Sequence, residues 1–233
     1  MHNNTIVPAT ILGICIAIAG ISVGVGFFKG RAADRYVTVK GLAEREVRAD
    51  LAIWPITFRV TTNDLGTLRQ GIETSRKAVR EFLTEAGFGD ADISSSVPRI
   101  NDTQAFGGNV RTLYRYVADV TITTRSTDVD RVKKTMEQAG ALVGKGVVLA
   151  ADNWQNPTEF IFTKLNTIKP EMIEAATKDA RSAAEKFATD SGSQVGKIRS
   201  ASQGYFSITD RDRNSPDVKQ IRVVTNVEYF LTD

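Results

Sequence analysis

Histidine and cysteine, on which most nucleophilic and zinc chemistry depends, each occur once in this chain of 233 residues. They are His2, close to the N-terminus, and Cys15, inside an uncharged apolar run. A Ser-His-Asp or Cys-His site needs an imidazole beside its nucleophile, and structural zinc sites use Cys and His. The sequence beyond the apolar run can build neither. We therefore predict that the protein is not an enzyme and has no catalytic residues, cofactor or metal ligands.

Two further patterns carry weak chemical signals. Gly140–Lys145 resembles a phosphate-binding loop, but it is one residue too short, and Gly146 stands where a Ser or Thr would bind magnesium. We interpret this segment as a helix end and turn. Glu44 and Glu46 share one face of a predicted strand, where two carboxylates could act as acid and base. A solvated strand edge explains the pair equally well.

A third pattern resembles the start of a calcium-binding loop. Asp210, Asp212 and Asn214 have the alternating spacing of its first ligands. The sixth position is Ser215 where such loops need Gly, and the twelfth is Ile221 where they need Glu. We therefore predict an exposed polar turn.

The charge distribution argues against nucleic-acid binding. The chain has 30 Lys and Arg and 27 Asp and Glu, a net charge of +3. Acidic and basic residues alternate along predicted helix faces, as in Arg80 and Glu81, whereas nucleic-acid binding needs a concentrated basic surface. With one cysteine, no intrachain disulfide can form, and cysteine usage does not indicate the compartment.

The N-terminal segment predicts a membrane helix. Residues 6–28 contain no charged side chain, and about 20 apolar residues in a helix span the hydrocarbon core of a bilayer. A cleaved signal peptide remains an alternative, because Gly30-Arg31-Ala32 offers a small-x-small cleavage site. Against it, the run is long and residues 1–5 contain no Lys or Arg. A lipoprotein is less favoured, since Ile14 stands where a small residue should precede Cys15.

Small residues within this segment predict helix self-association. Gly20 and Gly24 are four residues apart, as are Gly13 and Ala17, and this spacing lets two helix backbones approach closely. The alternative is that glycine is simply common in membrane helices.

The rest of the sequence predicts strand pairs separated by helices, in the order ββαββαββαββ. The predicted strands are 36–42, 54–61, 93–100, 114–122, 147–151, 159–163, 198–208 and 219–231. Three helices are predicted. The first is capped by Asn63 or Asp64, the second starts after Thr127, and the third has Pro170 in its first turn. We predict an α+β fold: an N-terminal transmembrane helix (1–28), a short basic linker (29–35), and a domain (36–233) with a mixed or antiparallel sheet packed by about three helices.

Two predicted elements bear on packing. The third helix has an alanine-rich inner face, which implies a close approach to a sheet; we expect this face to comprise Ile173, Ala176, Ala180, Ala183, Ala184 and Phe187. The last strand, 219–231, carries apolar residues on both faces and must be covered on both. Tyr205 and Phe206 are expected to pack in the core, with an interaction surface as the alternative.

The segment Val37–Ala52 resembles the opening of SIMPL-domain proteins, whose pattern is a strand, Gly-x-Gly, a spacer and Pro-Asp-x-Ala. Gly41, Asp50 and Ala52 match, while Ala43 and Ala49 replace the second Gly and the Pro. Further matches in order and spacing are Tyr116–Ala118, Ala176–Ala188, Gly192–Gly196 and Val224–Leu231.

The resemblance implies a bacterial protein of the cell envelope. Proteins of this family are typically exported, some are linked to oxidative-stress defence, some are surface or periplasmic antigens, and ring-like oligomers are known. No catalytic residues are carried over from the family. The resemblance favours a periplasmic domain, whereas Lys29, Arg31 and Arg35 after the helix favour a cytoplasmic one.

Together these observations predict a single-pass protein of the inner membrane whose domain lies in the periplasm. Membrane lipid contacts residues 6–28, and the domain is a non-enzymatic, self-associating scaffold or interaction module, a homo-oligomer without nucleic acid. The alternative is a weak enzyme or small-ligand binder that uses carboxylates. A pocket with convergent titratable groups would favour the second hypothesis, and a large exposed apolar or edge-strand surface the first.

Overall fold

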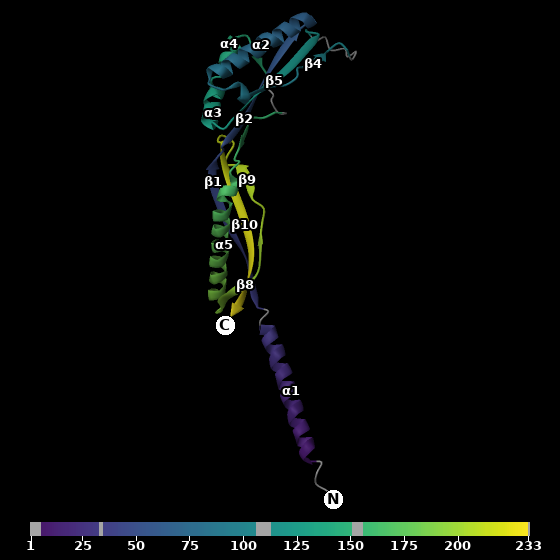
Figure 1. Cartoon of the computed structure of the whole chain (residues 1–233), viewed down its shortest axis with the longest axis vertical. Coiled ribbons are helices and arrows are strands. Elements are labelled where there is room, and N and C mark those ends of the chain that lie inside the picture. The colour runs from purple at the N-terminus through teal and green to yellow at the C-terminus, as the bar shows by residue number, and fades with distance from the viewer. Residues whose placement is uncertain (1–5, 33–34, 106–112, 151–155, 233) are drawn as a thin grey trace. The chain divides into compact units, whose positions relative to one another are not determined.

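The structure is a computed structural model that describes residues 6–32, 35–105, 113–150 and 156–232. Within the first helix it describes the side chains of residues 11–24. His2 and the tip of the predicted loop at 106–109 lie outside the described residues. The helices are α1 (Ile6–Ala32), α2 (Leu65–Glu85), α3 (Val129–Glu137), α4 (Ala141–Gly144) and α5 (Leu165–Asp190), with a 3-10 turn at Asp90–Asp92 (Figure 1).

The strands are divided between two sheets, where the sequence predicted one. They are β1 (Tyr36–Arg48), β2 (Leu51–Thr62), β3 (Ile93–Ser95), β4 (Arg99–Asp102), β5 (Tyr116–Ser126), β6 (Val148–Leu149), β7 (Glu159–Ile161), β8 (Gln194–Gln203), β9 (Ser207–Asp210) and β10 (Val218–Thr232). One sheet has the order β1-β10-β8 with β9 beside β10, and the other has the order β3-β5-β2-β6 with β4 beside β5 and β7 beside β2. The α+β class with antiparallel sheets is confirmed. Alternation along a strand shows which face is buried but not which sheet the strand joins.

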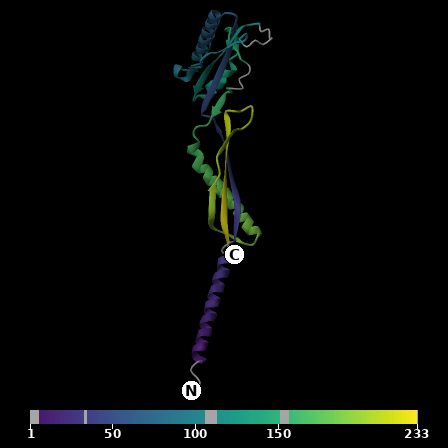
Figure 2. The same ribbon diagram turned by 90° about the vertical axis from the view of Figure 1, so that its right-hand side faces the viewer.

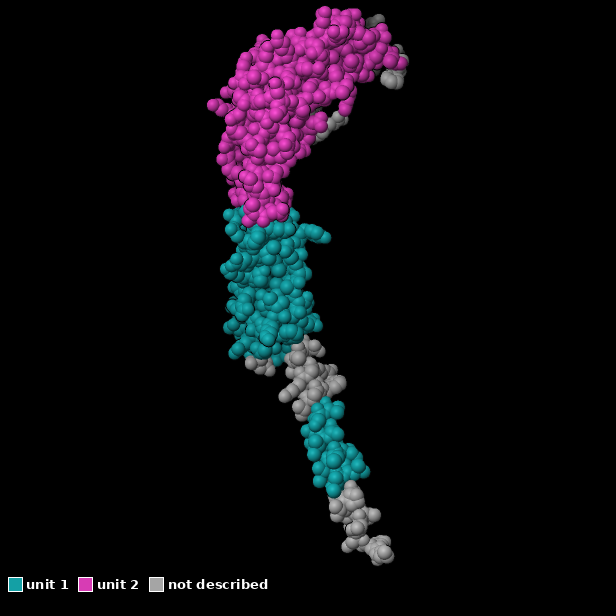
Figure 3. All heavy atoms as spheres, in the orientation of Figure 1, with its two compact units in different colours: residues 1–45, 168–207, 221–233 teal, residues 46–167, 208–220 magenta. Residues whose placement is uncertain are grey.

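The chain forms two compact units, coloured separately in Figure 3. Unit 1 comprises residues 1–45, 168–207 and 221–233 and contains most of the four-stranded sheet. Unit 2 comprises residues 46–167 and 208–220 and contains the six-stranded sheet. Each unit has a hydrophobic core of its own.

The core of unit 2 lies between α2, α3 and one face of the six-stranded sheet. Trp54, Ile56 and Phe58 of β2 alternate into this core, as their period of two predicts. Helix α2 begins where the sequence predicted, because the Asp64 carboxylate accepts a hydrogen bond from the Thr67 amide at 2.7 Å. The opposite face of the sheet consequently carries the intervening, more polar residues of β2.

The core of unit 1 lies between α5 and β1 and β10 of the four-stranded sheet (Figures 1 and 2). The predicted alanine-rich face is confirmed, with one correction: Phe187 is 63% exposed. The buried residues of the helix are Met172, Ala176, Ala180, Ala184 and Ala188. Gly41 of β1 explains why they are small, since a Cβ at this position would lie 1.8 Å from the Ala176 carbonyl oxygen.

Several predicted boundaries are wrong. The predicted strand 198–208 is two strands, β8 and β9, and two other errors have a local cause. Helix α5 begins at Leu165, so Pro170 lies inside it. Proline has no amide hydrogen, and the backbone carbonyl four residues earlier therefore lacks its helical hydrogen-bond donor. The early start follows a turn held by Asp50, whose carboxylate accepts hydrogen bonds from the Thr163 amide at 2.8 Å and the Thr163 hydroxyl at 3.1 Å. The predicted strand 93–100 is split into β3 and β4 around Pro98, which cannot donate to a ladder.

The N-terminal segment is helical, as predicted, over Ile6–Ala32. Its described apolar side chains are exposed, and those of Ile16 and Ile21 are 65% and 66% exposed. Among the side chains that the structure describes, no helix offers a stretch long and apolar enough to cross a membrane. The predicted membrane segment 6–28 extends beyond the described side chains at both ends.

Candidate functional site

A hollow of about 710 Å³ lies on the face of the six-stranded sheet that points away from α2. Its floor is formed by the residues of β2 and β5 that alternate with core residues, among them Thr57 and Thr121. Val97 lines it beside β4, and Pro157 lines it ahead of β7. The hollow therefore lies entirely within unit 2.

A row of three charged side chains crosses the floor. Arg59 of β2 lies opposite Asp119 of β5, and Asp119 lies opposite Arg99 of β4. Arg59 donates two hydrogen bonds to the Asp119 carboxylate, from Nε to Oδ1 at 2.7 Å and from Nη2 to Oδ2 at 3.0 Å. The hollow is therefore lined by charges of both signs, because the carboxylates of Asp119 and Glu159 line it together with the two guanidinium groups.

Hydroxyl groups occupy the next positions along the strands. The Oγ1 atoms of Thr57 and Thr121 lie 2.9 Å apart and share a hydrogen bond. The Thr121 amide donates to Ser96 Oγ at 3.0 Å, which places the Ser96 hydroxyl beside the same pair. Thr123 follows two residues further along β5, opposite Pro55. The hollow thus joins a charged row to a strip of hydroxyls that can both donate and accept.

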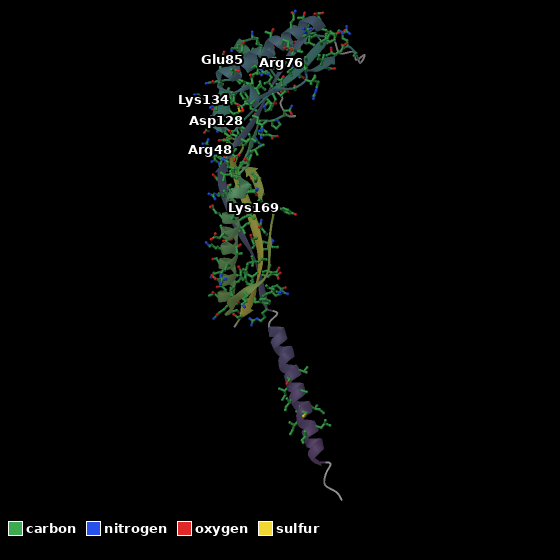
Figure 4. The ribbon with its side chains drawn as sticks, viewed as in Figure 1. Arg48, Arg76, Glu85, Asp128, Lys134 and Lys169 are labelled. Atoms are coloured by element: carbon green, nitrogen blue, oxygen red, sulfur yellow. The ribbon has the colours of Figure 1, made fainter. Side chains whose placement is uncertain are left out.

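A buried carboxylate forms a second charged cluster in unit 2. The Asp217 side chain is 5% exposed, and its Oδ1 lies 2.9 Å from Lys133 Nζ of α3. Arg48, labelled in Figure 4, lies 3.9 Å from the other carboxylate oxygen and also pairs with Asp130. Burial alone would raise the pKa of Asp217, but the bond to Lys133, a backbone hydrogen bond and the charge of Arg48 lower it. This cluster joins α3 to the start of β10 and has a structural role.

Strand β8 forms an exposed edge of the four-stranded sheet. Among the described strands it pairs with β10 alone, and most of its side chains are exposed, including Ile198. Beyond its end, the Gly204 amide donates to the Val224 carbonyl at 2.8 Å. Tyr205 then leaves the ladder and is 100% exposed, which corrects its predicted place in the core. Phe206 turns back and is half-buried beside Lys169, whose Nζ lies 5.6 Å from the ring centre.

The predicted self-association residues Gly20 and Gly24 lie in α1. A Cβ on either would meet no atom of this chain within 4 Å, so both positions are open for an approaching helix. The structure contains one chain and leaves the association itself a prediction.

The two weak motifs form a short helix with a turn and an exposed polar turn. The phosphate-loop-like segment 140–145 forms the short helix α4 and a turn that ends at Gly146, with a φ of 82°. In the calcium-loop-like turn, Asp210 pairs with Lys219, and Asp212 with Arg211. Among the described residues, no group of three or more His, Cys, Asp or Glu side chains could hold a metal ion.

The two predicted strand carboxylates do not form a pair. Glu44 lies 3.6 Å from Arg222, and Glu46 lies 3.8 Å from Arg211. Each glutamate is thus part of a separate, solvated ion pair, as the alternative interpretation expected.

Sequence reasoning identified the strands that form the hollow but not the hollow itself. The polar partners Thr57 and Arg59 were visible as the second face of a half-buried strand, and Asp119 and Thr121 as that of another. The missing information was the pairing register, which places Asp119 between Arg59 and Arg99.

Comparison with known proteins gives one family. The family model SIMPL, described as a protein of unknown function (DUF541), matches residues 37–229. No curated protein matches the chain at a significant level.

Proposed function

Since the chain belongs to the SIMPL family, we propose that it is a membrane-anchored, non-enzymatic interaction module of the cell envelope that associates with copies of itself. The observation that carries this proposal is the exposed edge of the four-stranded sheet, formed by β8 and Tyr205. An edge strand presents unpaired backbone groups that another chain can pair with. Tyrosine is also enriched among the residues that dominate interface energies.

The neighbouring strand β10 supports the same proposal. One face of β10 is buried against α5 through Val227 and Tyr229. On its other face Val224 and Phe230 are only half-buried within the single chain. A second copy that pairs along β8 would extend the sheet and cover more of this apolar surface.

Sedimentation velocity on the detergent-solubilised full chain tests self-association. We expect an oligomer whose dissociation constant rises when β8 is blocked by Ala201→Pro. Gly204 bonds to Val224 of β10, and in the same register Ser202 and Ser200 also face β10, so the Ala201 amide points to the open edge. Proline there removes an edge hydrogen-bond donor, and its ring obstructs pairing. Arg213→Pro, in the exposed turn before β10, is the proline control. An oligomer unaffected by Ala201→Pro in a protein of unchanged circular dichroism would contradict the role of this edge.

The proposed anchor is the segment 6–28. Two observations support it: the absence of charged residues across this run, and the exposure of its described apolar side chains, which favours an apolar surrounding. Alkaline extraction of membranes tests it, with the full chain remaining in the membrane and a chain starting at residue 36 released. Measuring the intact mass of the mature protein shows whether the N-terminal segment is kept. A mature chain that begins near Ala33 would contradict a retained anchor.

We further propose that the domain lies in the periplasm, as the family resemblance implies. The basic residues after the helix favour the opposite orientation, with the domain in the cytoplasm. A reporter that is active only outside the cytoplasm, fused after Asp233, should be active. Activity of a cytoplasmic reporter at the same position, with silence of the first, would place the domain inside. Exchanging Lys29 and Arg31 for Gln tests the opposing charges and should increase the periplasmic signal.

A further inference from the structure

We propose that the open edge of the four-stranded sheet pairs with the same edge of a second copy, strand β8 antiparallel to strand β8, across a two-fold axis at Ser202. This inference rests on the self-association proposed above and adds its symmetry and its register. It implies that the sheet contact ends at two copies, because a two-fold contact uses the same edge of both chains.

The other edge of this sheet is blocked by a helix of the same chain. Strand β1 forms that edge, and its Leu42 amide donates to the Asp179 carboxylate of α5 at 2.9 Å instead of to a strand. Helix α5 lies against the same stretch of β1, where a Cβ at Gly41 would lie 1.8 Å from the Ala176 carbonyl oxygen (Figure 1). A strand from another chain would have to displace these contacts. Strand β8 is therefore the edge of this sheet that a second copy can reach.

The length of β8 favours its own image as the partner. Strand β8 has ten residues, whereas β3, β4, β6 and β7 of the six-stranded sheet have two to four residues each. Short edge strands offer few backbone groups to another chain. Parallel pairing of two β8 strands in register would place Lys197 and Arg199 each opposite its own image, and like charges directly opposite are destabilising. The two edges therefore meet antiparallel.

The regular part of the edge determines the register. Strand β8 follows β10 residue by residue from Ser200 to Gln203, and the hydrogen bond of the Gly204 amide extends this pairing. Every second residue, Ser200 and Ser202 included, faces β10, so Ala201 and Gln203 present their amides and carbonyls outward. An axis at Ser202 places Ala201 opposite Gln203 of the second copy. In this register all the outward backbone groups of the regular stretch are paired.

The side chains beside this stretch suit the same register. With the axis at Ser202, Arg199 of each copy lies opposite Tyr205 of the other. A guanidinium group over an aromatic ring is favourable, and within its own chain Arg199 already lies 4.0 Å from the centre of the Tyr36 ring. An axis at Arg199 would instead place two guanidinium groups opposite each other. The register at Ser202 thus gives the fully exposed Tyr205 ring a partner.

Disulfide trapping tests the register on the detergent-solubilised full chain with Cys15→Ala, which removes its one cysteine. Ser202→Cys should form a covalent dimer with oxidised glutathione. Its opposed Cα atoms would lie about 4.5 Å apart, within the range of disulfides. Ala201→Cys and Gln203→Cys are the matched controls, because each would lie diagonally from its own image, about 7–8 Å away. Neither should crosslink alone, whereas a chain carrying both should.

The combination with sedimentation velocity separates this inference from the proposed function. If Ala201→Pro weakens association but Ser202→Cys does not crosslink, or crosslinks no better than Ala201→Cys, the edge associates in another arrangement. The inference then fails and the proposed function stands. If Ala201→Pro leaves association unchanged, both fail.

A charge variant tests the side-chain pairing. Tyr205→Arg would bring a second cation to Arg199 of the other copy. Its dissociation constant should be at least about tenfold above that of Tyr205→Phe at low salt, with a smaller difference at high salt. Circular dichroism should be unchanged, because Tyr205 is fully exposed within the single chain. Equal dissociation constants of Tyr205→Arg and Tyr205→Phe would overturn the register.

Discussion

The backbone of Gly41 in β1 contacts helix α5 so closely that a Cβ at this position would lie 2.5 Å from the amide nitrogen of Ala180 and 2.8 Å from its Cβ. Both sides of the contact are reduced to the smallest residues, because Ala176 and Ala180 are fully buried there. This gives a physical reason for one of the positions that carry the family resemblance. The glycine lets a helix and a strand pack backbone to backbone.

Replacing Gly41 with Ala should therefore destabilise unit 1. Helix α5 would have to move away from the sheet, and such overpacking costs about 1–3 kcal/mol or more. Thermal unfolding followed by circular dichroism should show a clearly lower Tm. Gly144→Ala is the control, because a Cβ there meets no atom within 4 Å. Equal melting of the two variants would show that α5 has room to move.

Asp217→Asn should destabilise unit 2 by about 1–2 kcal/mol, since it leaves Lys133 and Arg48 without their buried partner. The pKa of Asp217 is lower in the folded protein than its usual value of about 3.9 in an unfolded chain. A lowered folded pKa stabilises the protein above the unfolded pKa, and this stabilisation disappears as the pH falls through the folded pKa. The difference between wild type and variant should consequently be full at pH 6 and shrink below about pH 4.

Urea unfolding at several pH values measures this difference in the free energy of unfolding. Asp190→Asn is the matched control, because its ion pair with Lys186 is exposed and such pairs contribute little. A difference between wild type and Asp217→Asn that does not depend on pH would show that the carboxylate acts through its shape and not through its charge.

Asp50 and Thr163 should be energetically coupled. The carboxylate accepts from both the amide and the hydroxyl of Thr163 and so holds the turn before α5. Asp50→Ala removes both hydrogen bonds and should cost about 1–3 kcal/mol, whereas Thr163→Val removes only one and should cost about 1 kcal/mol. The double variant should be less destabilised than the sum of the two. Strict additivity in this double-mutant cycle would contradict the contact.

Tyr205→Ala should separate association from stability. A fully exposed side chain contributes little to folding, so the Tm should stay within the small range of surface substitutions. If Tyr205 lies in the proposed contact between copies, sedimentation velocity should show weaker association. Leu113→Ala, at another exposed position, should change neither quantity. A lowered Tm for Tyr205→Ala would instead place the ring in the fold of the single chain.

The sequence predicted the individual helices and strands better than it predicted which strands pair with one another. The alternation of Trp54, Ile56 and Phe58 determines a strand face, and Asp64 determines a helix start, because both signals depend on near neighbours in the chain. The division into two sheets depends on pairings between distant strands, which leave no local pattern. Tyr205 was misplaced for the same reason, since the bond from Gly204 to Val224 that pushes it outward joins separate strands.

The hollow lay beyond sequence reasoning for a related cause. Arg59, Asp119 and Arg99 are ordinary charged residues on three separate strands, and each would suit a solvated sheet face. Only the register of β2, β5 and β4 aligns them in one row. The absence of His and Cys from the predicted domain, by contrast, could be stated from composition alone.

Because β1 pairs with β10, the four-stranded sheet can be completed only late in the synthesis of the chain. The Leu231 amide donates to the Arg35 carbonyl at 2.8 Å, so the opening of the domain is bonded to its last residues. Every strand of the six-stranded sheet lies between Leu51 and Ile161 and leaves the ribosome much earlier. This sheet can assemble while β1 still waits for its neighbour. A chain that stops before residue 218 leaves β1 without that neighbour, and such a product is a substrate for proteases and aggregation.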